Sequence, residues 1–315
     1  MSSENIGIGR SGSSRLTVLI LTKDEELHIS RCIKSVKAIA DRVCVVDSGS
    51  NDETVAIAKA LGAEVWEKSW VNYASQFNWA LRRIADPGTW VLRLDADEVV
   101  SAELAREVGI HLGSLSRAVC GVRVRRRMAF LGRPIRYGGV FPIRVTRLFR
   151  WGHGWCEKRW MDEHIVVEGD VVEFRGELLD DNRKSLTWWI EKHNAYASRE
   201  VVDILGREHG FLREDMASGI QFRDPARTKR WMKERVYLRL PVGARAFLYF
   251  AYRYVLRFGF LDGQKGAAFH FFQGFWYRYL VDMKLLEVKW CMRSQGMEPE
   301  HAIRHVLGID VYAAP

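Results

Sequence analysis

The sequence has few cysteines and lacks long apolar runs. Its five cysteines are scattered over 315 residues, and no two of them form a C-x-x-C pair. This pattern argues against a disulfide framework or a structural zinc site, and it favours a reducing compartment. No stretch approaches the roughly 18 uninterrupted apolar residues of a membrane-spanning helix. Residues 1–14 are polar and rich in glycine and serine, which predicts a flexible tail and no secretory signal.

Positive charge is in excess and is unevenly distributed. The net charge is +9 and apolar residues make up 48% of the chain, an ordinary balance for a globular protein of one or two domains. Ten basic and two acidic residues lie between Arg223 and Arg257, which gives this segment a net charge of +8. Aromatic residues interleave with it and continue to Tyr279. Such a segment suits an anionic membrane surface or a nucleic acid.

Short apolar strands alternate with amphipathic helices in the first hundred residues. The pattern predicts strands at 16–21, 42–46, 64–66 and 90–94, and helices at 25–36, 52–61 and 73–84. This alternation predicts right-handed crossovers and a parallel sheet covered by helices, an α/β fold. In sheets of this kind, ligands bind beyond the carboxyl ends of the strands.

Acidic and small polar residues follow three of the four predicted strands, at 22–26, 47–52 and 95–98. A single acidic residue there usually caps a helix, but three such loops on one edge favour a ligand site. The last loop contains Asp95 and Asp97, and two carboxylates at a strand end can hold Mg²⁺ or Mn²⁺. Such a metal completes its shell with water and substrate phosphates, and it stabilises a departing diphosphate.

Three segments, VLILTKDEE, VVDSGSNDET and WVLRLDADE, occur in this order over residues 18–98. They resemble the inverting nucleotide-sugar glycosyltransferases of family 2, which have the GT-A fold. The resemblance covers about residues 16–190 and is strongest to the bacterial branch that builds lipopolysaccharide core and exopolysaccharide. It implies a Rossmann-like, mostly parallel sheet flanked by helices over residues 15–184, followed by a helical region over 185–315.

The resemblance also implies which residues bind the donor. Thr22 and Glu26 would line the nucleoside pocket, and Asp47 would hydrogen-bond the base or the ribose. Asn78 would face the same pocket. Many family members carry Asn at the position of Asp24, so no contact is assigned to that residue.

The two aspartates of the third loop receive separate roles by the same resemblance. Asp95 would contact the ribose or the metal, and Asp97 would coordinate the metal, Mg²⁺ or Mn²⁺. The donor would be a nucleotide diphosphate sugar, with UDP favoured by its prevalence in the family. The acceptor would be a saccharide linked to a lipid.

Inversion at a sugar carbon needs a base on the face opposite the leaving diphosphate, within hydrogen-bond reach of the acceptor hydroxyl. In the resembling branch an acidic pair supplies it, here Asp162 and Glu163, followed by His164. We expect Glu163 to be the base, but the order of the pair is reversed from the usual Glu-Asp, so the choice between the two stays open. Arg144 and Arg147 are candidates for phosphate or acceptor contacts, or else solvated residues of a surface strand.

The C-terminal region predicts aromatic-rich helices, one of which carries Arg245, Arg253 and Arg257 at roughly helical spacing. This pattern is typical of a helix that lies in a membrane interface, where arginine reaches the headgroups. The alternative is a helical pair that packs against the catalytic domain or a second subunit. We therefore expect a cytoplasmic enzyme that binds the inner face of the cytoplasmic membrane peripherally.

Two other classes of function were weighed. A metal-dependent nucleotidyltransferase also uses paired carboxylates, but the loop at 22–26 lacks the Gly-rich, basic signature expected there. A basic scaffold or nucleic-acid-binding protein would use the C-terminal half, but no helix-turn-helix, RRM or zinc pattern is present in the sequence. We therefore expect no nucleic-acid partner.

Overall fold

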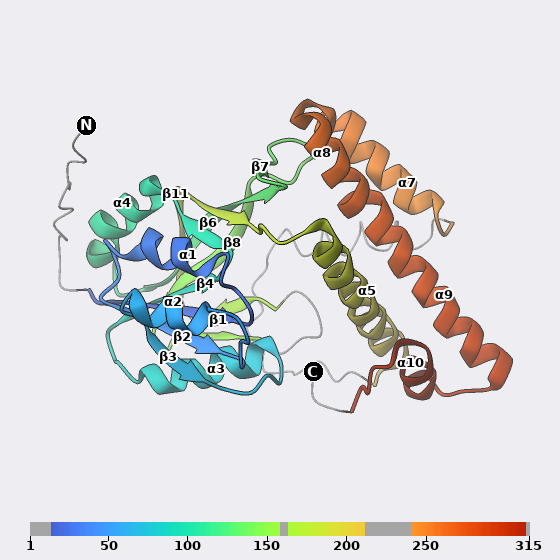
Figure 1. Ribbon diagram of the computed structural model, residues 1–315, viewed down its shortest axis with the longest axis horizontal. Coiled ribbons are helices and arrows are strands. Elements are labelled where there is room, and N and C mark those ends of the chain that lie inside the picture. The colour runs from blue at the N-terminus through green and yellow to red at the C-terminus, as the bar shows by residue number, and fades with distance from the viewer. Residues whose placement is uncertain (1–13, 158–162, 212–240, 313–315) are drawn as a thin grey trace. The chain divides into compact units, whose positions relative to one another are not determined.

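The computed structural model describes residues 14–157, 163–211 and 241–312, which form two compact units (Figure 1). The first, here the sheet unit, comprises the described residues up to Arg136 together with Val140–Glu157 and Glu163–Lys184. The second, here the helical unit, comprises Tyr137–Gly139 and the described residues from Ser185 onward.

A mixed sheet of nine strands forms the centre of the sheet unit among the described residues. Its order is β3-β2-β1-β4-β8-β6-β11-β5, and β7 pairs with β6. The strands are β1 Leu16–Thr22, β2 Arg42–Asp47, β3 Glu64–Glu67, β4 Trp90–Asp95, β5 Glu98–Val100, β6 Val119–Phe130, β7 Arg133–Pro134, β8 Ile143–Arg150 and β11 Asp170–Asp181. Strands β3, β2, β1 and β4 are parallel to one another, as β6 is to β11, whereas β8 is antiparallel to both of its neighbours.

Helices cover both faces of this sheet because successive side chains of each strand point to opposite faces. On one face Leu92 and Leu94 pack in a core with α1 (Ile29–Val36) and α4 (Ala102–His111). On the other face Val91 packs with α3 (Tyr73–Ile84).

Four further elements complete the described part of the sheet unit. They are α2 (Thr54–Ala60), the 3-10 helix η1 (Leu112–Ser114) and the antiparallel pair β9 (Gly154–Cys156) and β10 (Ile165–Val167). The α/β class expected from the sequence, a parallel-stranded sheet flanked by helices with a helical region after it, is confirmed.

The consecutive arginines of β6 pair with carboxylates of the neighbouring strand β11. Arg125 bonds Glu173 at 3.3 Å, and Arg127 bonds Glu177. The third, Arg126, lies 3.8 Å from Asp180. These cross-strand ion pairs explain why a run of positive charge is stable inside a strand.

The helical unit has its core between α5, α9 and α10. Its elements are α5 Leu186–His209, α7 Ala244–Ala251, η2 Tyr252–Leu256, η3 Gly259–Asp262, α8 Gly263–Phe269, η4 His270–Trp276, α9 Tyr277–Gln295 and α10 Pro299–Leu307. Val201 and Leu205 of α5 are fully buried in this core, together with Val288 of α9. None of the described helices is both long and apolar enough to cross a bilayer.

The expectation that Arg245 and Arg253 reach lipid headgroups is wrong. Arg245 is 5% exposed, and its guanidinium forms a two-pronged ion pair with the buried Asp282 of α9. Arg253 is 4% exposed, and its Nε donates to the carbonyl of Gly138. Arg257 is exposed, as expected. The basic residues between 223 and 239 lie outside the described residues.

This buried pair generates a prediction about stability. Arg245→Leu leaves the Asp282 carboxylate buried without its partner, so we expect a loss of about 3–5 kcal/mol in the free energy of unfolding. Arg257→Leu changes an exposed residue and is expected to cost about 0.5 kcal/mol or less.

Denaturant titration of the helical signal measures both variants. The double substitution of Arg245 and Asp282 by leucine should recover most of the loss, because it removes both charges. A loss below about 1 kcal/mol for Arg245→Leu alone would contradict the assigned role of the ion pair.

Candidate active site

The loops predicted to converge do so, because the strands that precede them are neighbours. Thr22 at the end of β1 is in register with Asp47 at the end of β2, and Leu21 is in register with Asp95 at the end of β4. Adjacent strands lie about 4.8 Å apart, so Asp47 and Asp95 flank β1 at one edge of the sheet, with their backbones about 10 Å apart.

Asp47 shapes the loop that follows β2. Its carboxylate accepts hydrogen bonds from the backbone N–H groups of Gly49 and Ser50 at 2.8 and 2.7 Å. It also accepts from the hydroxyls of Ser50 and Thr22 at 2.5 and 3.1 Å. Asp47 is 1% exposed and Thr22 is 4% exposed, so these two residues support the loop from its buried side. Their contact with a nucleoside stays a prediction.

The loops after β1 and β2 are fastened to each other. The Glu26 carboxylate accepts from the backbone N–H of Glu53 at 3.1 Å, and the Glu25 N–H donates to Thr54 Oγ1 at 2.7 Å. Asp24 adopts a positive φ of 54° at the turn. Glu26 is exposed, so its carboxylate faces solvent at the predicted nucleoside pocket.

Asp95 is held by three side chains. Tyr73 donates its hydroxyl proton to Oδ1 at 2.8 Å, Arg147 donates to Oδ2 at 3.1 Å, and Arg93 lies 3.6 Å from Oδ1. Burial opposes the charge of this carboxylate, but the two guanidinium groups and the tyrosine outweigh it. The pKa of Asp95 therefore lies well below its usual range, and the group stays ionised.

Glu98 completes this buried cluster. It is 1% exposed, forms an ion pair with Arg147, and accepts from the backbone N–H of Asp95 at 3.0 Å. Burial raises the pKa of Glu98, whereas Glu98 and Asp95 together raise the pKa of Arg147 against its burial. Arg147 therefore positions Asp95 in this structure, while Arg144 pairs with Glu173 at 2.8 Å.

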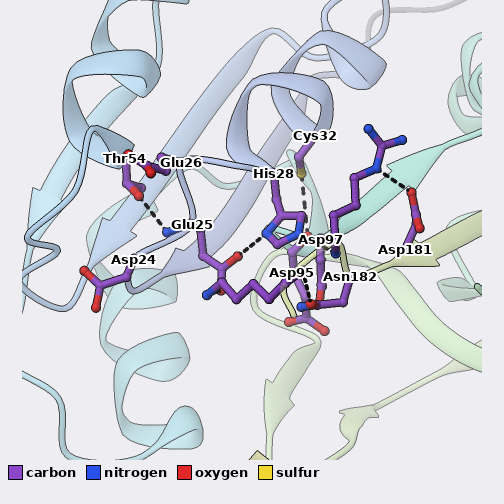
Figure 2. A network of polar contacts seen from close by, with 12 residues as sticks. Asp24, Glu25, Glu26, His28, Cys32, Thr54, Asp95, Asp97, Asp181 and Asn182 are labelled. Atoms are coloured by element: carbon purple, nitrogen blue, oxygen red, sulfur yellow. Dashed lines mark hydrogen bonds and ion pairs between the residues drawn. The ribbon is translucent and has the colours of Figure 1, made fainter. Parts of the chain in front are cut away.

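Asp97 is oriented by the segment that follows β11 (Figure 2). Asn182 donates from Nδ2 to Asp97 Oδ2 at 2.9 Å, and the backbone N–H of Asp181 donates to the Asp97 carbonyl at 3.1 Å. Asp97 Oδ1 accepts no hydrogen bond from any of the described residues. Sequence reasoning missed Asn182, since nothing in the sequence indicates that the end of β11 meets the loop after β4.

The same segment is also bonded to the loop after β1. Lys184 Nζ lies 2.9 Å from Glu25 Oε1, and the backbone N–H of Arg183 donates to His28 Nε2 at 2.8 Å. His28 Nε2 must therefore be unprotonated, so its ring donates from Nδ1 to Glu25 Oε2 at 2.6 Å (Figure 2). Burial opposes ionisation of Glu25, but His28 and Lys184 lower its pKa overall.

Asn78 is bonded to the backbone of β9, and its contact with the nucleoside pocket stays a prediction. Its Nδ2 donates to the carbonyl of Cys156 at 2.8 Å, and its Oδ1 accepts from the N–H of the same residue at 2.9 Å. The amide thereby clamps β9, which leads to Glu163. The backbone carbonyl of Glu163 accepts from Arg93 at 3.4 Å, and Asp162 lies outside the described residues.

The donor set fits a hard divalent cation. Asp97 offers one carboxylate oxygen, and the Asp95 side chain is 32% exposed beside it. No group of three or more His, Cys, Asp or Glu side chains in the described part of the chain is placed to hold a metal. An Asp97 oxygen beside the partly exposed Asp95, with the rest of the coordination shell open, suits Mg²⁺ or Mn²⁺, which keep waters and bind substrate phosphates.

Comparison with known proteins identifies the family. The glycosyl transferase family 2 model matches residues 17–170. The lipopolysaccharide core biosynthesis glycosyltransferase LpsC of Rhizobium meliloti is 32% identical over 190 residues, which cover 58% of this chain and 69% of that protein. The chain belongs to glycosyl transferase family 2, as the resemblance of its three N-terminal segments predicted.

Two other similarities cover less of the proteins compared. An uncharacterised glycosyltransferase of Rickettsia conorii is 44% identical over 101 residues, so this chain spans about a third of its length, 35%. The crystal structure of glucosyl-3-phosphoglycerate synthase from Mycobacterium tuberculosis with Mn²⁺ and UDP aligns at 23% identity with a TM-score of 0.29. That alignment covers 36% of this chain and 45% of that chain, and it carries no argument here.

The orientation of Asp97 generates a prediction about metal binding. Asp97→Asn should keep the fold and lose most Mn²⁺ affinity in the presence of UDP, because one charged ligand is removed. Asn182→Ala should weaken Mn²⁺ binding by about tenfold, since residues that orient a ligand typically contribute 10- to 100-fold. Calorimetry or Mn²⁺ electron paramagnetic resonance measures both.

The matched control is Asp86→Asn, because Asp86 pairs with the exposed Arg15 on another part of the surface. It should leave Mn²⁺ affinity unchanged. Unaltered Mn²⁺ affinity in folded Asp97→Asn would show that the metal binds elsewhere.

Proposed function

We propose that the chain transfers a sugar from a UDP-sugar to a hydroxyl of a lipid-linked saccharide, with inversion, during synthesis of a bacterial cell-surface polysaccharide. One observation carries this proposal: Asp95 and Asp97 lie together at the carboxyl end of β4. Asp97 has one carboxylate oxygen available, and Asp95 is held by Tyr73 and Arg147. Membership of family 2 supports the reaction class, and the similarity to LpsC supports the saccharide acceptor.

Donor binding is divided between the two aspartates. Asp97 would hold Mg²⁺ or Mn²⁺, which supplies positive charge to the departing diphosphate. Both oxygens of Asp95 already accept hydrogen bonds from the protein, so this carboxylate suits a ribose hydroxyl better than a metal. The exposed Glu26 and the buried Thr22 and Asp47 would form the nucleoside pocket.

Glu163 is the proposed general base, with Asp162 as the alternative. As the acceptor hydroxyl attacks the anomeric carbon, its proton passes to the Glu163 carboxylate. The bond between that carbon and the diphosphate oxygen breaks on the opposite face, and its electron pair leaves with the nucleotide. Stereochemical inversion follows from this single displacement.

The base is tested by UDP release from a panel of nucleotide sugars, using the one that the wild type hydrolyses fastest. Glu163→Gln should lower turnover by roughly a hundredfold, because the carboxylate that accepts the proton is lost, while UDP affinity with Mn²⁺ stays unchanged. A larger effect of Asp162→Asn would exchange the roles of the pair. Wild-type rates in both variants would refute a base in this segment.

The helical unit exposes a run of apolar side chains that supports membrane contact. Around η2 and η3 the exposed residues, here called the apolar tip, are Val255, Leu256, Phe258, Phe260 and Leu261. Leu256 is 68% exposed and Phe258 is 56% exposed. Burying one large apolar side chain contributes about 1.5–3 kcal/mol, so a few such residues suffice for peripheral binding.

Membrane contact through the apolar tip differs in salt dependence from contact through arginines. Because its residues are apolar, we expect the binding contributed by the apolar tip to persist from about 0.1 M to about 1 M salt, where the screening length falls from ~10 to ~3 Å. Leu256→Asp combined with Phe258→Asp should lower the cosedimented fraction several-fold without changing donor hydrolysis.

Trp290→Asp is the matched control, because Trp290 is exposed on α9 outside the apolar tip. It should leave cosedimentation unchanged. Equal recovery of the wild type in the supernatant with and without liposomes would contradict membrane contact.

A further inference from the structure

Arg93 is a charged residue inside an otherwise apolar strand. It lies in β4 and is 9% exposed, while its neighbours Leu92 and Leu94 are almost completely buried. Burial of a cation costs several kcal/mol unless partners compensate it. Side chains alternate along the strand, so Arg93 projects from the same face as Asp95, two residues later.

The guanidinium of Arg93 contacts three separate segments. Its Nε donates to the Tyr73 hydroxyl of α3 at 2.5 Å, and its central carbon lies 4.2 Å from the centre of the Tyr73 ring. One terminal nitrogen lies 3.6 Å from Asp95 Oδ1, and the other donates to the backbone carbonyl of Glu163 at 3.4 Å. A planar group with donors on several edges can make all three contacts at once, which an ammonium cannot.

Glu163 lies just before β10, whose pairing with β9 anchors this segment. Asn78 clamps Cys156 on β9, and the backbone N–H of Glu157 donates to the His164 carbonyl at 3.0 Å. Arg93 contacts both the Glu163 carbonyl and the Asp95 carboxylate, so this segment lies beside the end of β4.

We propose that Arg93 is a positioning residue that holds the backbone of Glu163 in register with Asp95. It thereby sets the separation between the general base and the donor. This inference rests on the proposed role of Glu163 as base. Displacement of a reacting group by about 1 Å can cost a hundredfold in rate, so one such bridge has a large effect on turnover.

The test is a double-mutant cycle between Arg93→Lys and Glu163→Gln, read as UDP release from the nucleotide sugar that the wild type hydrolyses fastest. Arg93→Lys alone should lower turnover tenfold or more and leave UDP affinity with Mn²⁺ within about threefold. In the Glu163→Gln background the same substitution should cost less than about threefold, because the group that Arg93 positions no longer acts.

Equal losses in both backgrounds, a large loss of UDP affinity, or no loss at all would each overturn the inference. If Glu163→Gln itself has wild-type turnover, the proposed base fails, which the single variant shows independently. Should Arg93→Lys not fold, Tyr73→Phe replaces it, since it removes the acceptor of Arg93 Nε and keeps the ring beneath the guanidinium. Because Tyr73 also donates to Asp95, its loss should shrink without vanishing in the Glu163→Gln background, and an equal loss in both backgrounds would overturn the inference.

Discussion

The neutralisation of buried carboxylates at the carboxyl end of β4 is the interaction on which the site depends. Asp95 and Glu98 are held by Arg93 and Arg147, and each of the four is bonded to at least one other. Removal of one member of a buried pair typically costs about 3–5 kcal/mol, because a charge is left uncompensated. These four residues therefore form a buried, charge-compensated cluster beneath the site. Asp97 lies outside this buried cluster and keeps a carboxylate oxygen for an added cation.

Two further sets of hydrogen bonds and ion pairs hold the loops around this buried cluster. In the segment after β11, Asn182 bonds Asp97 (Figure 2) and Lys184 bonds Glu25, so this segment joins the loops after β4 and β1. Asp47 in turn fixes the loop after β2 through bonds to its own backbone. The site is thus built from loops, but each loop is bonded to another, which favours a preformed donor pocket over one that orders on binding.

The sequence was sufficient for the parallel part of the sheet and for its functional edge. The predicted strand at 90–94 is β4, and the helix at 73–84 is α3, because both have clear hydrophobic periods bounded by polar residues. The helix expected from residue 25 begins at Ile29 instead, and residues 25–28 form a turn in which the Glu25 carbonyl accepts from the N–H groups of His28 and Ile29. Hydrophobic periodicity does not separate such a turn from the first turn of a helix.

Residues whose partners are distant in sequence could not be predicted. Asn182 meets Asp97 across 85 positions, and Arg245 meets Asp282 across 37. The headgroup contact predicted for Arg245 was wrong, because an arginine at helical spacing gives the same sequence pattern whether it faces solvent or an internal aspartate. The sequence does give one indication for Arg93: it is a cation inside a strand expected to be buried. Buried cations are uncommon without a partner.

The central claim is that Asp97 binds the metal while Asp95 stays bonded to the protein. A crystal structure with Mn²⁺ and UDP, using the anomalous signal of manganese, tests it most directly. The account predicts a manganese peak about 2.1 Å from Asp97 Oδ1, with the bonds of Asp95 to Tyr73 and Arg147 intact. Manganese bound to Asp95 with those bonds broken, or UDP bound with no manganese at Asp97, would contradict it.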